Sequence, residues 1–317
     1  MNNNKSEREE YLYQSWGSST DILWSYPIID YVSLFRMKLV KELIGDINGK
    51  MAIDIGCGNG SISLLLWSLG AKVSSIDTSI EALQVTRNIR SLSKDSVPVE
   101  NLQEITHNRD LGERIQQFRT NLCQSDAMQL PYKEETFDFV CCLETLEFVQ
   151  DDMPAIREIE RITKMGGIIL LFVPYDRRAN SEAKSLGYYR RYSFKTIKEK
   201  MITSTLDLKR FIFWYFPMLK LLDLIRLRYI YAAIGLWIEA FFDRKNSHRS
   251  RNLRNRDVFI HSLTRFYQTK FWHNVAMPLM LRLLNLNKLF QHYPYSDARS
   301  HANDVFLILK KTHKPRN

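Results

Sequence analysis

The residues best suited to chemistry form a glycine-rich loop at the end of a short apolar run. Gly56, Gly58 and Gly60 follow this run at alternate positions, and Asp54 precedes the first of them by two residues. Glycines permit a tight turn and let a ligand lie against bare backbone, while the first amide groups of a following helix can donate hydrogen bonds. The loop therefore predicts a binding site for a nucleotide-like ligand.

A second acidic residue narrows the class of ligand. Asp77 ends the next apolar run, about 20 residues after the loop, where a carboxylate can hold both hydroxyls of a ribose. The glycines follow the pattern GxGxG, and Ser61 stands where the dinucleotide pattern GxGxxG has its third small residue. Asp54 would repel a pyrophosphate and attract a cation. S-adenosylmethionine carries a sulfonium and an ammonium group and no phosphate, so the loop favours this methyl donor over a nicotinamide dinucleotide.

The elements that must hold this site are short apolar runs separated by segments with helical periodicity. Continuous apolar runs, in place of alternating ones, are typical of parallel strands that are buried on both faces. The pattern predicts βαβ units wound into a Rossmann-like α/β fold with a mostly parallel, seven-stranded sheet. The predicted strands cover residues 51–56, 72–77, 121–126, 137–143, 167–174, 208–216 and 304–311.

The chain divides into three predicted segments of different charge. Residues 1–45 form an N-terminal helical cap, residues 46–216 form the Rossmann-like core that strand 304–311 completes, and residues 217–303 form a basic, aromatic-rich helical insertion. Up to Pro174, 17 Lys and Arg stand against 25 Asp and Glu, a net charge of −8, whereas the remainder carries +18. An anionic partner is therefore expected at the second part of the chain.

On these motifs the chain resembles the class I S-adenosylmethionine-dependent methyltransferases, from about Lys50 to Ser193 and again at the closing strand. Segments Ser125–Ala127, Leu130–Val140 and Met165–Pro174 match further blocks of that family. The resemblance implies an enzyme that uses S-adenosylmethionine, with an acidic side chain near the adenine. The cofactor-binding residues that it implies are Asp54, Gly56, Cys57, Gly58, Asn59, Gly60, Asp77, Thr78, Asp126, Ala127 and Leu143.

The segment after the fourth predicted strand resembles the ubiquinone-type (type 11), small-molecule branch of the family. Glu144 and Glu147 match the Glu-x-x-Glu-His pattern of that branch, whereas Phe148 replaces its histidine. Phe148 can neither take a proton nor bind a metal, which argues against histidine base catalysis or metal assistance from this position. The Asn/Asp-Pro-Pro-aromatic tetrad of nucleobase amino methyltransferases and the Pro-Cys pair of cytosine carbon-5 enzymes are absent.

A second element of the same branch borders the acceptor pocket. Gly187–Ser193 resembles the pattern Gly-His-x-Arg-x-Tyr/Phe-Ser/Thr, with Tyr188 in place of the histidine and Arg190 at the arginine. Tyr188 either packs as a pocket wall or, with its pKa lowered by nearby arginines, acts as a base. Arg190 suits an anionic acceptor or is surface charge. The predicted catalytic residues are Glu144, Glu147, Tyr188 and Arg190, and no metal site is predicted.

The predicted reaction is methyl transfer to an oxygen, with nitrogen as the less favoured alternative, of a small or lipid-like acceptor, for which the arginines would suit an anionic group. The apolar runs within residues 211–242 are shorter than the ~20 residues of a spanning helix and are interrupted by charges. Residues 217–303 either cover the acceptor site or let residues 211–256 contact an anionic membrane surface. The alternatives are an RNA methyltransferase, although no RNA module is evident and nucleic acid is not the expected partner, and a non-catalytic S-adenosylmethionine-binding protein.

Composition excludes several classes of protein. With 317 residues, 45% hydrophobic and 25% charged, the chain suits a globular fold and excludes collagen-like, low-complexity and wholly disordered classes. Its four cysteines include no CxxC pair, which predicts neither a disulfide framework nor a zinc site. The first residues show no basic region followed by an apolar run, so we expect no secretory signal peptide and a cytoplasmic protein, with peripheral membrane contact left open.

Overall fold

The computed structural model describes residues 31–92, 94, 102–103, 105–175, 189–202, 205–214 and 304–312. One compact unit contains Arg36–Trp214 and the closing strand, and it holds the sheet and the candidate site. Of the predicted N-terminal cap, only the helix α2 (Tyr31–Ile44) is described. The predicted insertion 217–303 lies outside the described residues, so its structure stays a prediction.

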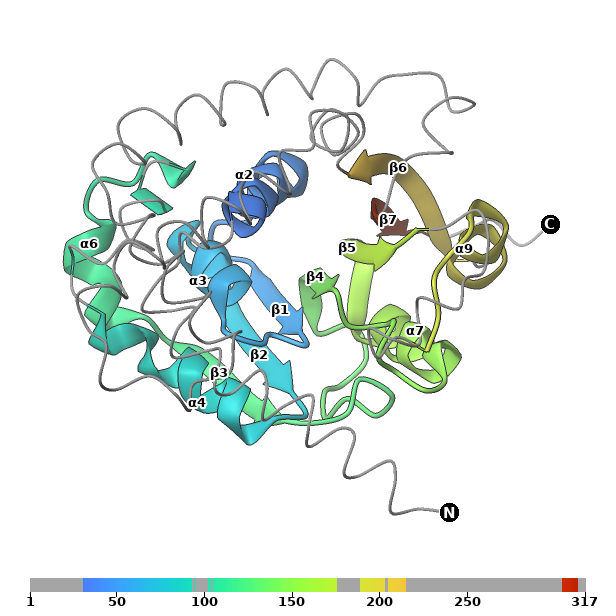
Figure 1. Ribbon diagram of the computed structural model, residues 1–317, viewed down its shortest axis with the longest axis horizontal. Helices are drawn as coiled ribbons and strands as arrows, with labels where there is room; N and C mark the ends of the chain where they lie inside the picture. The colour runs from blue at the N-terminus through green and yellow to red at the C-terminus, as the bar shows by residue number, and fades with distance from the viewer. Residues whose placement is uncertain are drawn as a thin grey trace, which may run out of the picture. The chain divides into compact units, whose positions relative to one another are not determined.

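Seven strands form one sheet in the order β3-β2-β1-β4-β5-β7-β6 (Figure 1). The first five are mutually parallel, and β7 is antiparallel to both β5 and β6. The predicted fold class, a doubly wound and mostly parallel seven-stranded sheet, is confirmed. The strands are β1 (Met51–Ile55), β2 (Lys72–Asp77), β3 (Thr120–Gln124), β4 (Phe137–Leu143), β5 (Thr163–Pro174), β6 (Leu206–Trp214) and β7 (Asp304–Lys311).

The strand β1 lies where the order of the strands reverses. From β1 the chain adds β2 and β3 on one side, and it then returns to place β4 and β5 on the other. Ile53, in the middle of β1, pairs with Ser74 of β2 and Val140 of β4 and is completely buried. In open α/β sheets, ligands bind beyond the carboxyl ends of the strands at such a reversal. The end of β1 is therefore the place where the fold itself predicts a site.

The antiparallel strand β7 brings a distant part of the sequence to the same edge. Its residues from Val305 to Leu309 are buried, and the ring of Phe306 stacks on that of Phe172, with the ring centroids 4.2 Å apart. Asp304 pairs with Pro174 at the end of β5. Because β7 runs against β5, its first residue lies beside the carboxyl end of β5.

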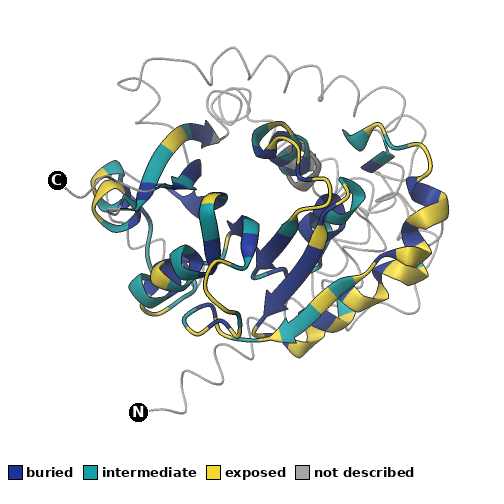
Figure 2. Cartoon of the chain, turned by 180° about the vertical axis from the view of Figure 1, so that it is seen from behind, coloured by how far each residue is buried: buried dark blue, intermediate teal, exposed yellow. Residues whose placement is uncertain are grey.

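Helices cover both sides of the sheet. In Figure 1, α3 and α4 lie on one side, against β1, β2 and β3, whereas α7 lies on the other side, against β5, with α9 beside it. Figure 2 shows the central strands as buried and the surrounding helices as partly exposed. None of the helices in the described part of the chain is both long and apolar enough to cross a membrane. Besides α2, the helical segments are α3 (Ser61–Ser68), α4 (Ile80–Asn88), η1 (Ile89–Ser91), α6 (Leu111–Arg114), η2 (Ile115–Gln117), α7 (Asp152–Ile162) and α9 (Phe194–Met201).

Candidate active site

The glycine-rich loop turns the chain from the end of β1 into α3. Gly56, Gly58 and Gly60 have φ angles of 69°, 51° and 74°, in the left-handed region that favours glycine. The amide of Cys57 donates to the carbonyl of Ile76 at 2.9 Å, and the amide of Gly60 donates to the carbonyl of Cys57 at 2.8 Å. The loop is thus a tight turn fixed to the neighbouring strand β2.

Two threonines close the space around this loop. Thr145, just after β4, places its Oγ1 only 2.2 Å from where a Cβ on Gly56 would lie. Thr86 on α4 donates from Oγ1 to the carbonyl of Gly58 at 3.1 Å, and that same oxygen is 2.6 Å from where a Cβ on Gly60 would lie. Side chains at these glycines would collide with neighbours that themselves hold the loop.

Asp77 lies at the end of β2 with its carboxylate turned to the loop. Its Oδ2 accepts a hydrogen bond from the amide of Gly58 at 2.9 Å, and its Oδ1 accepts one from the amide of Ser79 at 2.9 Å. Burial raises the pKa of Asp77, although these two hydrogen bonds favour the ionised form. A carboxylate offers about four lone-pair sites. Backbone amides of Ser79, Gly58 and Thr78 use part of them, and what remains can accept from a ribose hydroxyl.

Asp54 lies behind the loop, in β1, and is only 2% exposed. Its Oδ2 accepts from the hydroxyl of Ser63 at 2.6 Å, and Ser63 in turn accepts from the hydroxyl of Ser75 at 2.7 Å. Burial raises the pKa of Asp54 to about 7, with a smaller contribution from the charge of Asp77. The pair of acidic groups makes this edge unfavourable for a pyrophosphate, as the sequence indicated.

The other predicted cofactor residues lie at the carboxyl ends of β1, β2, β3 and β4. Asn59 accepts with Oδ1 from the amide of Ser61 at 3.1 Å and so supports the start of α3. Burial raises the pKa of the Cys57 thiol well above its usual value, so this cysteine is not a thiolate nucleophile. Leu143 ends β4 and is buried.

After β3, the predicted adenine-side residues form a turn. Asp126 is exposed, and its Oδ1 accepts from the amide of Met128 at 2.8 Å. Ala127 beside it is buried. The carbonyl of Thr78 accepts from the side-chain amide of Gln124 at 2.9 Å, which links the ends of β2 and β3. The structure therefore brings all the predicted cofactor residues to one edge, and their contacts with a cofactor stay predictions.

The predicted catalytic residue Glu144 starts the turn after β4. Its φ of 51° is rare for a residue other than glycine, and its amide donates to the carbonyl of Phe172 at 3.0 Å. Its carboxylate forms an ion pair with Arg36 of α2, and the guanidinium of Arg36 lies over the ring of Phe172, 5.7 Å from its centroid. A charged side chain from α2 is thus part of the edge beyond β4.

Glu147 is the least expected feature of this turn. It is 1% exposed, and its Oε2 has no hydrogen-bond partner in the described part of the chain. Burial raises its pKa well above the usual value, and the charge of Glu144 adds to this effect. The backbone carbonyl of Glu147 accepts from the amide of Tyr189 at 2.7 Å, so the backbone is fixed while one carboxyl oxygen, Oε2, has no partner among the described residues.

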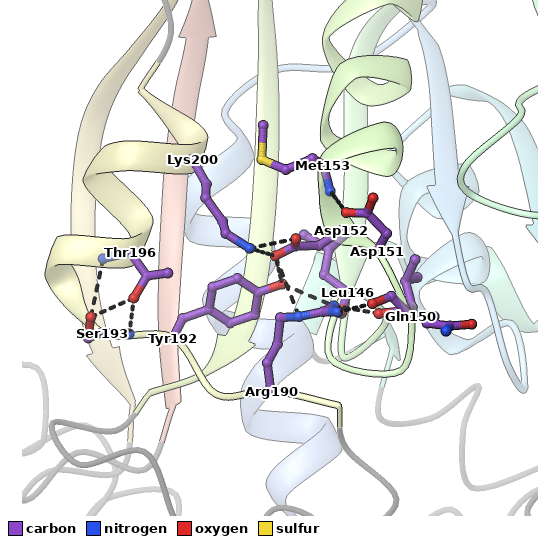
Figure 3. Close-up of polar contacts among 11 residues, drawn as sticks. Leu146, Gln150, Asp151, Asp152, Met153, Arg190, Tyr192, Ser193, Thr196 and Lys200 are labelled. Atoms are coloured by element: carbon purple, nitrogen blue, oxygen red, sulfur yellow. Dashed lines mark hydrogen bonds and ion pairs between the residues drawn. The ribbon is translucent and has the colours of Figure 1, made fainter.

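Arg190 contacts the turn after β4, and Figure 3 shows its contacts with Leu146 and Gln150. Its guanidinium donates to the carbonyl of Leu146 at 2.9 Å and also to those of Val149 and Gln150. Its Nε lies 3.7 Å from Oδ2 of Asp152. These contacts make Arg190 a positioning residue for the turn, and a direct contact with an acceptor stays a prediction.

Asp152 connects Arg190 to α9. It accepts from the hydroxyl of Tyr192 at 2.9 Å and from the ammonium group of Lys200 at 2.7 and 2.9 Å (Figure 3). Burial acts to raise the pKa of Asp152, but the hydrogen bonds from Lys200 and Tyr192 and the charge of Arg190 outweigh it, so the pKa is lowered. The predicted residue Tyr188 lies outside the described residues.

We expect Arg190→Gln to lower the free energy of unfolding by about 2–3 kcal/mol, because the carbonyls of residues 146–150 lose a charged donor. Binding of S-adenosylhomocysteine should change less than twofold, since Arg190 touches no residue of the glycine loop. Denaturant unfolding and calorimetry measure these quantities. Arg157→Gln is the matched control, because Arg157 is exposed on α7. Equal stability of the two variants would instead make Arg190 ordinary surface charge.

Three residues of this edge were not predicted from the sequence. Thr145 holds the glycine loop, and its Oγ1 lies within 3.1 Å of the carbonyl of Ile55. Arg36 and Asp304 come from the two ends of the described chain, far in sequence from the turn after β4. The only sequence signal was the position of Asp304 as the first residue of the last strand. The described residues hold no group of three or more His, Cys, Asp or Glu suited to a metal ion.

Comparisons with known proteins agree with this geometry. Residues 53–171 match the family described as "Methyltransferase domain". The ubiquinone biosynthesis O-methyltransferase of Nitrosomonas europaea is 29% identical over 136 residues, which are 43% of this chain and 48% of that protein. The demethylmenaquinone methyltransferase of Halalkalibacterium halodurans is 26% identical over 170 residues, 54% of this chain and 61% of that protein. The chain thus spans between about half and three fifths of the length of these relatives.

Among solved structures, phosphoethanolamine N-methyltransferase 2 of Haemonchus contortus, in complex with S-adenosyl-L-methionine, has a TM-score of 0.47 and 16% identity. The match covers 87% of this chain and 52% of that one. The matched residues 53–171 include the glycine loop, Asp77 and the turn after β4. The part of the sheet that holds the candidate site is therefore similar to a methyltransferase domain over residues 53–171.

Proposed function

We propose that this chain transfers the methyl group of S-adenosylmethionine to a hydroxyl oxygen of a small or lipid-like acceptor. The observation that carries the proposal is the carboxylate of Asp77, which accepts from the amide of Gly58 and so lies at the end of β2 beside the glycine loop. The relatives named for ubiquinone biosynthesis are O-methyltransferases, which supports transfer to oxygen. The N-methylation of a similar acceptor is the less favoured variant of the same proposal.

On the cofactor side, the residues bind and orient. Asp77 accepts from the ribose hydroxyls, and the glycine loop lets the nucleoside lie against the backbone. The turn at Asp126 and Ala127 borders the adenine. The bound cofactor supplies an activated methyl group on a sulfonium, and the new carbon–oxygen bond forms as the carbon–sulfur bond breaks, with its electron pair left on sulfur. The protein's task is therefore alignment and the exclusion of water.

On the acceptor side, Glu147 is the group best placed to take a proton. The hydroxyl must lose a proton when its oxygen becomes an ether, and Glu147 can receive it in its ionised form, whose basicity is increased by burial. Phe148 cannot replace the histidine of the ubiquinone-type branch in this role. Glu144 forms an ion pair with Arg36, so we assign it to shaping the turn. Tyr188 is retained as a second candidate base on its sequence position alone.

The lipid-like nature of the acceptor is supported by the sequence only. The basic residues of the segment Arg244–Arg256 follow an apolar, aromatic-rich stretch, which suits an anionic membrane surface. We propose peripheral membrane contact of an otherwise cytoplasmic protein. Sedimentation with vesicles of anionic phospholipid at low salt checks this: failure to bind would remove the membrane contact and leave the methyl transfer untouched.

We expect Asp77→Asn to weaken binding of S-adenosylhomocysteine by about 30- to 100-fold, because a neutral amide replaces charged hydrogen bonds to the ribose. Isothermal titration calorimetry measures the affinity. Glu134→Gln removes the same charge from an exposed turn and should change the affinity less than twofold. Tight binding of a nicotinamide dinucleotide by the wild-type chain, with no binding of S-adenosylhomocysteine, would contradict the proposed function.

A further inference from the structure

Glu147, in the turn after β4, has a buried carboxyl oxygen that finds no hydrogen-bond partner among the described residues. This oxygen is Oε2, and the residue is 1% exposed. Leaving a buried polar group unsatisfied destabilises a protein, and an apolar side chain of similar size would fit the same space without this cost. A ligand that donates a hydrogen bond would satisfy the carboxyl group when it binds.

A second carboxyl group reaches the same edge from the end of the chain. Asp304 begins β7, where it pairs with Pro174 of β5 and with Trp214 of β6. Alternate residues of a strand share one face, so Asp304 lies on the face of Phe306, whose ring stacks on that of Phe172. Arg36 lies over this same ring of Phe172. The register of β7 therefore brings Asp304 toward the guanidinium that pairs with Glu144.

The pKa shifts of Asp304 and Glu147 agree with the position of Asp304 near Arg36 and Glu144. Burial raises the pKa of Asp304 to about 7, and the charge of Glu144 adds to the rise, while Arg191 and Arg36 oppose it. The charges of Glu144 and Asp304 likewise raise the pKa of Glu147, and the charge of Arg36 opposes them. Glu147 and Asp304 thus lie in one group of charges drawn from α2, from the turn after β4, from the segment before α9 and from β7.

This combination of charges selects among ligands. Carboxyl groups and the guanidinium groups of Arg36 and Arg191 share this edge, so neither an anionic nor an ammonium group would meet charges of the opposite sign alone. A hydroxyl group carries no charge, and it donates one hydrogen bond and accepts others. Since Glu147 and Asp304 hold protons more readily than ordinary carboxylates, they can both accept from a hydroxyl and donate to it.

We propose that Glu147 and Asp304 form the hydrogen-bonding subsite for a hydroxyl group of the methyl acceptor, so that the acceptor is recognised as an uncharged alcohol or phenol. The inference rests on the proposed function, and it adds Asp304 as a specificity residue. It also departs from the anionic acceptor that Arg190 suggested in the sequence, because Arg190 donates to three backbone carbonyls.

Binding of simple aromatic probes tests the subsite. Phenol, toluene, benzoate and benzylamine share one ring and differ in the polar group, and ligand-observed NMR titration gives their affinities with and without S-adenosylhomocysteine. We expect phenol to bind at least tenfold more tightly than each of the other three. Asp304→Leu and Glu147→Leu should each reduce this preference to below threefold. Asp207→Leu is the matched control, because Asp207 is an acidic residue at the opposite end of the β6–β7 pair.

Thermal unfolding separates a ligand-binding carboxyl group from a structural one. If Glu147 binds the acceptor and does not stabilise the fold, Glu147→Leu should raise the Tm by about 4 °C, because an unsatisfied oxygen is removed from the interior. A structural role would make the same variant less stable. Glu147→Gln provides a second variant of the same size.

Two results would overturn the proposal: equal affinities of the wild-type chain for phenol and toluene, or tighter binding of benzoate than of phenol. If S-adenosylhomocysteine fails to bind, the proposed function fails, and the probe titrations without it still decide whether the subsite selects hydroxyl groups.

Discussion

Gly56→Ala is expected to abolish binding of S-adenosylhomocysteine and to lower the free energy of unfolding by about 3 kcal/mol or more. The new Cβ would lie 2.2 Å from Oγ1 of Thr145, far inside van der Waals contact. Thr145 cannot turn away without loss, because its hydroxyl lies within 3.1 Å of the carbonyl of Ile55 and 3.0 Å of that of Leu143. The loop must therefore move off Thr145, and the amide of Gly58 moves with it away from Asp77.

Gly166→Ala is the matched control for this prediction. Gly166 has a φ of 78°, similar to the 69° of Gly56, but nothing lies within 4 Å of the point that its Cβ would occupy. Gly166→Ala should therefore lower the free energy of unfolding only by the strain of the left-handed backbone, about 1 kcal/mol, and leave cofactor binding unchanged. The double variant Gly56→Ala/Thr145→Ala should recover part of the stability. Equal losses for Gly56→Ala and Gly166→Ala would show that Thr145 does not confine the loop.

The strands of the sheet could be predicted because burial on both faces produces continuous apolar runs. The predicted bounds differ from the observed ones at several strand ends, and two of these differences have a clear physical reason. β5 begins at Thr163, four residues before the predicted start, since the polar Lys164 and two glycines interrupt the apolar run where the pairing with β4 is irregular. β3 ends at Gln124, because Ser125 and Asp126 turn toward the neighbouring strand and the following turn.

The cofactor half of the site was predictable because its residues are close in sequence to the strands that carry them. The glycine loop and Asp77 follow β1 and end β2 directly, so the order of the strands was enough to bring them together. The acceptor half depends on long-range placement. Arg36 meets Glu144 across 108 residues of sequence, and Asp304 reaches the edge only through the antiparallel register of β7.

Arg190 shows a different limit of the sequence. Its position in the motif indicated an acceptor contact, but in the structure it donates to carbonyls of residues 146–150. Every residue carries a backbone carbonyl, so the residue types do not show which carbonyls accept hydrogen bonds. A pattern of side-chain types therefore could not show that the partner of this arginine is the turn itself.

The free energy of unfolding of the cofactor-free protein is expected to rise by about 2 kcal/mol or more when the pH is lowered from 7.5 to 5. Asp54 and Asp304 have folded-state pKa values raised to about 7, and those of Asp77 and Glu147 are raised as well. In the unfolded chain these groups ionise near pH 4, so their contribution to stability is fully present below that pH and is lost as the pH rises toward 7.

Groups with lowered pKa values act in the opposite direction but at lower pH. Asp138, Asp152 and Glu158 stabilise the fold above about pH 4 and lose this contribution only as the pH falls through their folded-state values. Between pH 5 and 7.5, the change in the free energy of unfolding therefore comes from the groups whose pKa values are raised. Asp54→Asn keeps a partner for the hydroxyl of Ser63 and removes the titration, so it should flatten the curve in that interval. Asp138→Asn should leave the slope there unchanged. Urea unfolding at several pH values measures both variants, and identical slopes for the wild type and Asp54→Asn would show that Asp54 is ionised in the folded protein at pH 5.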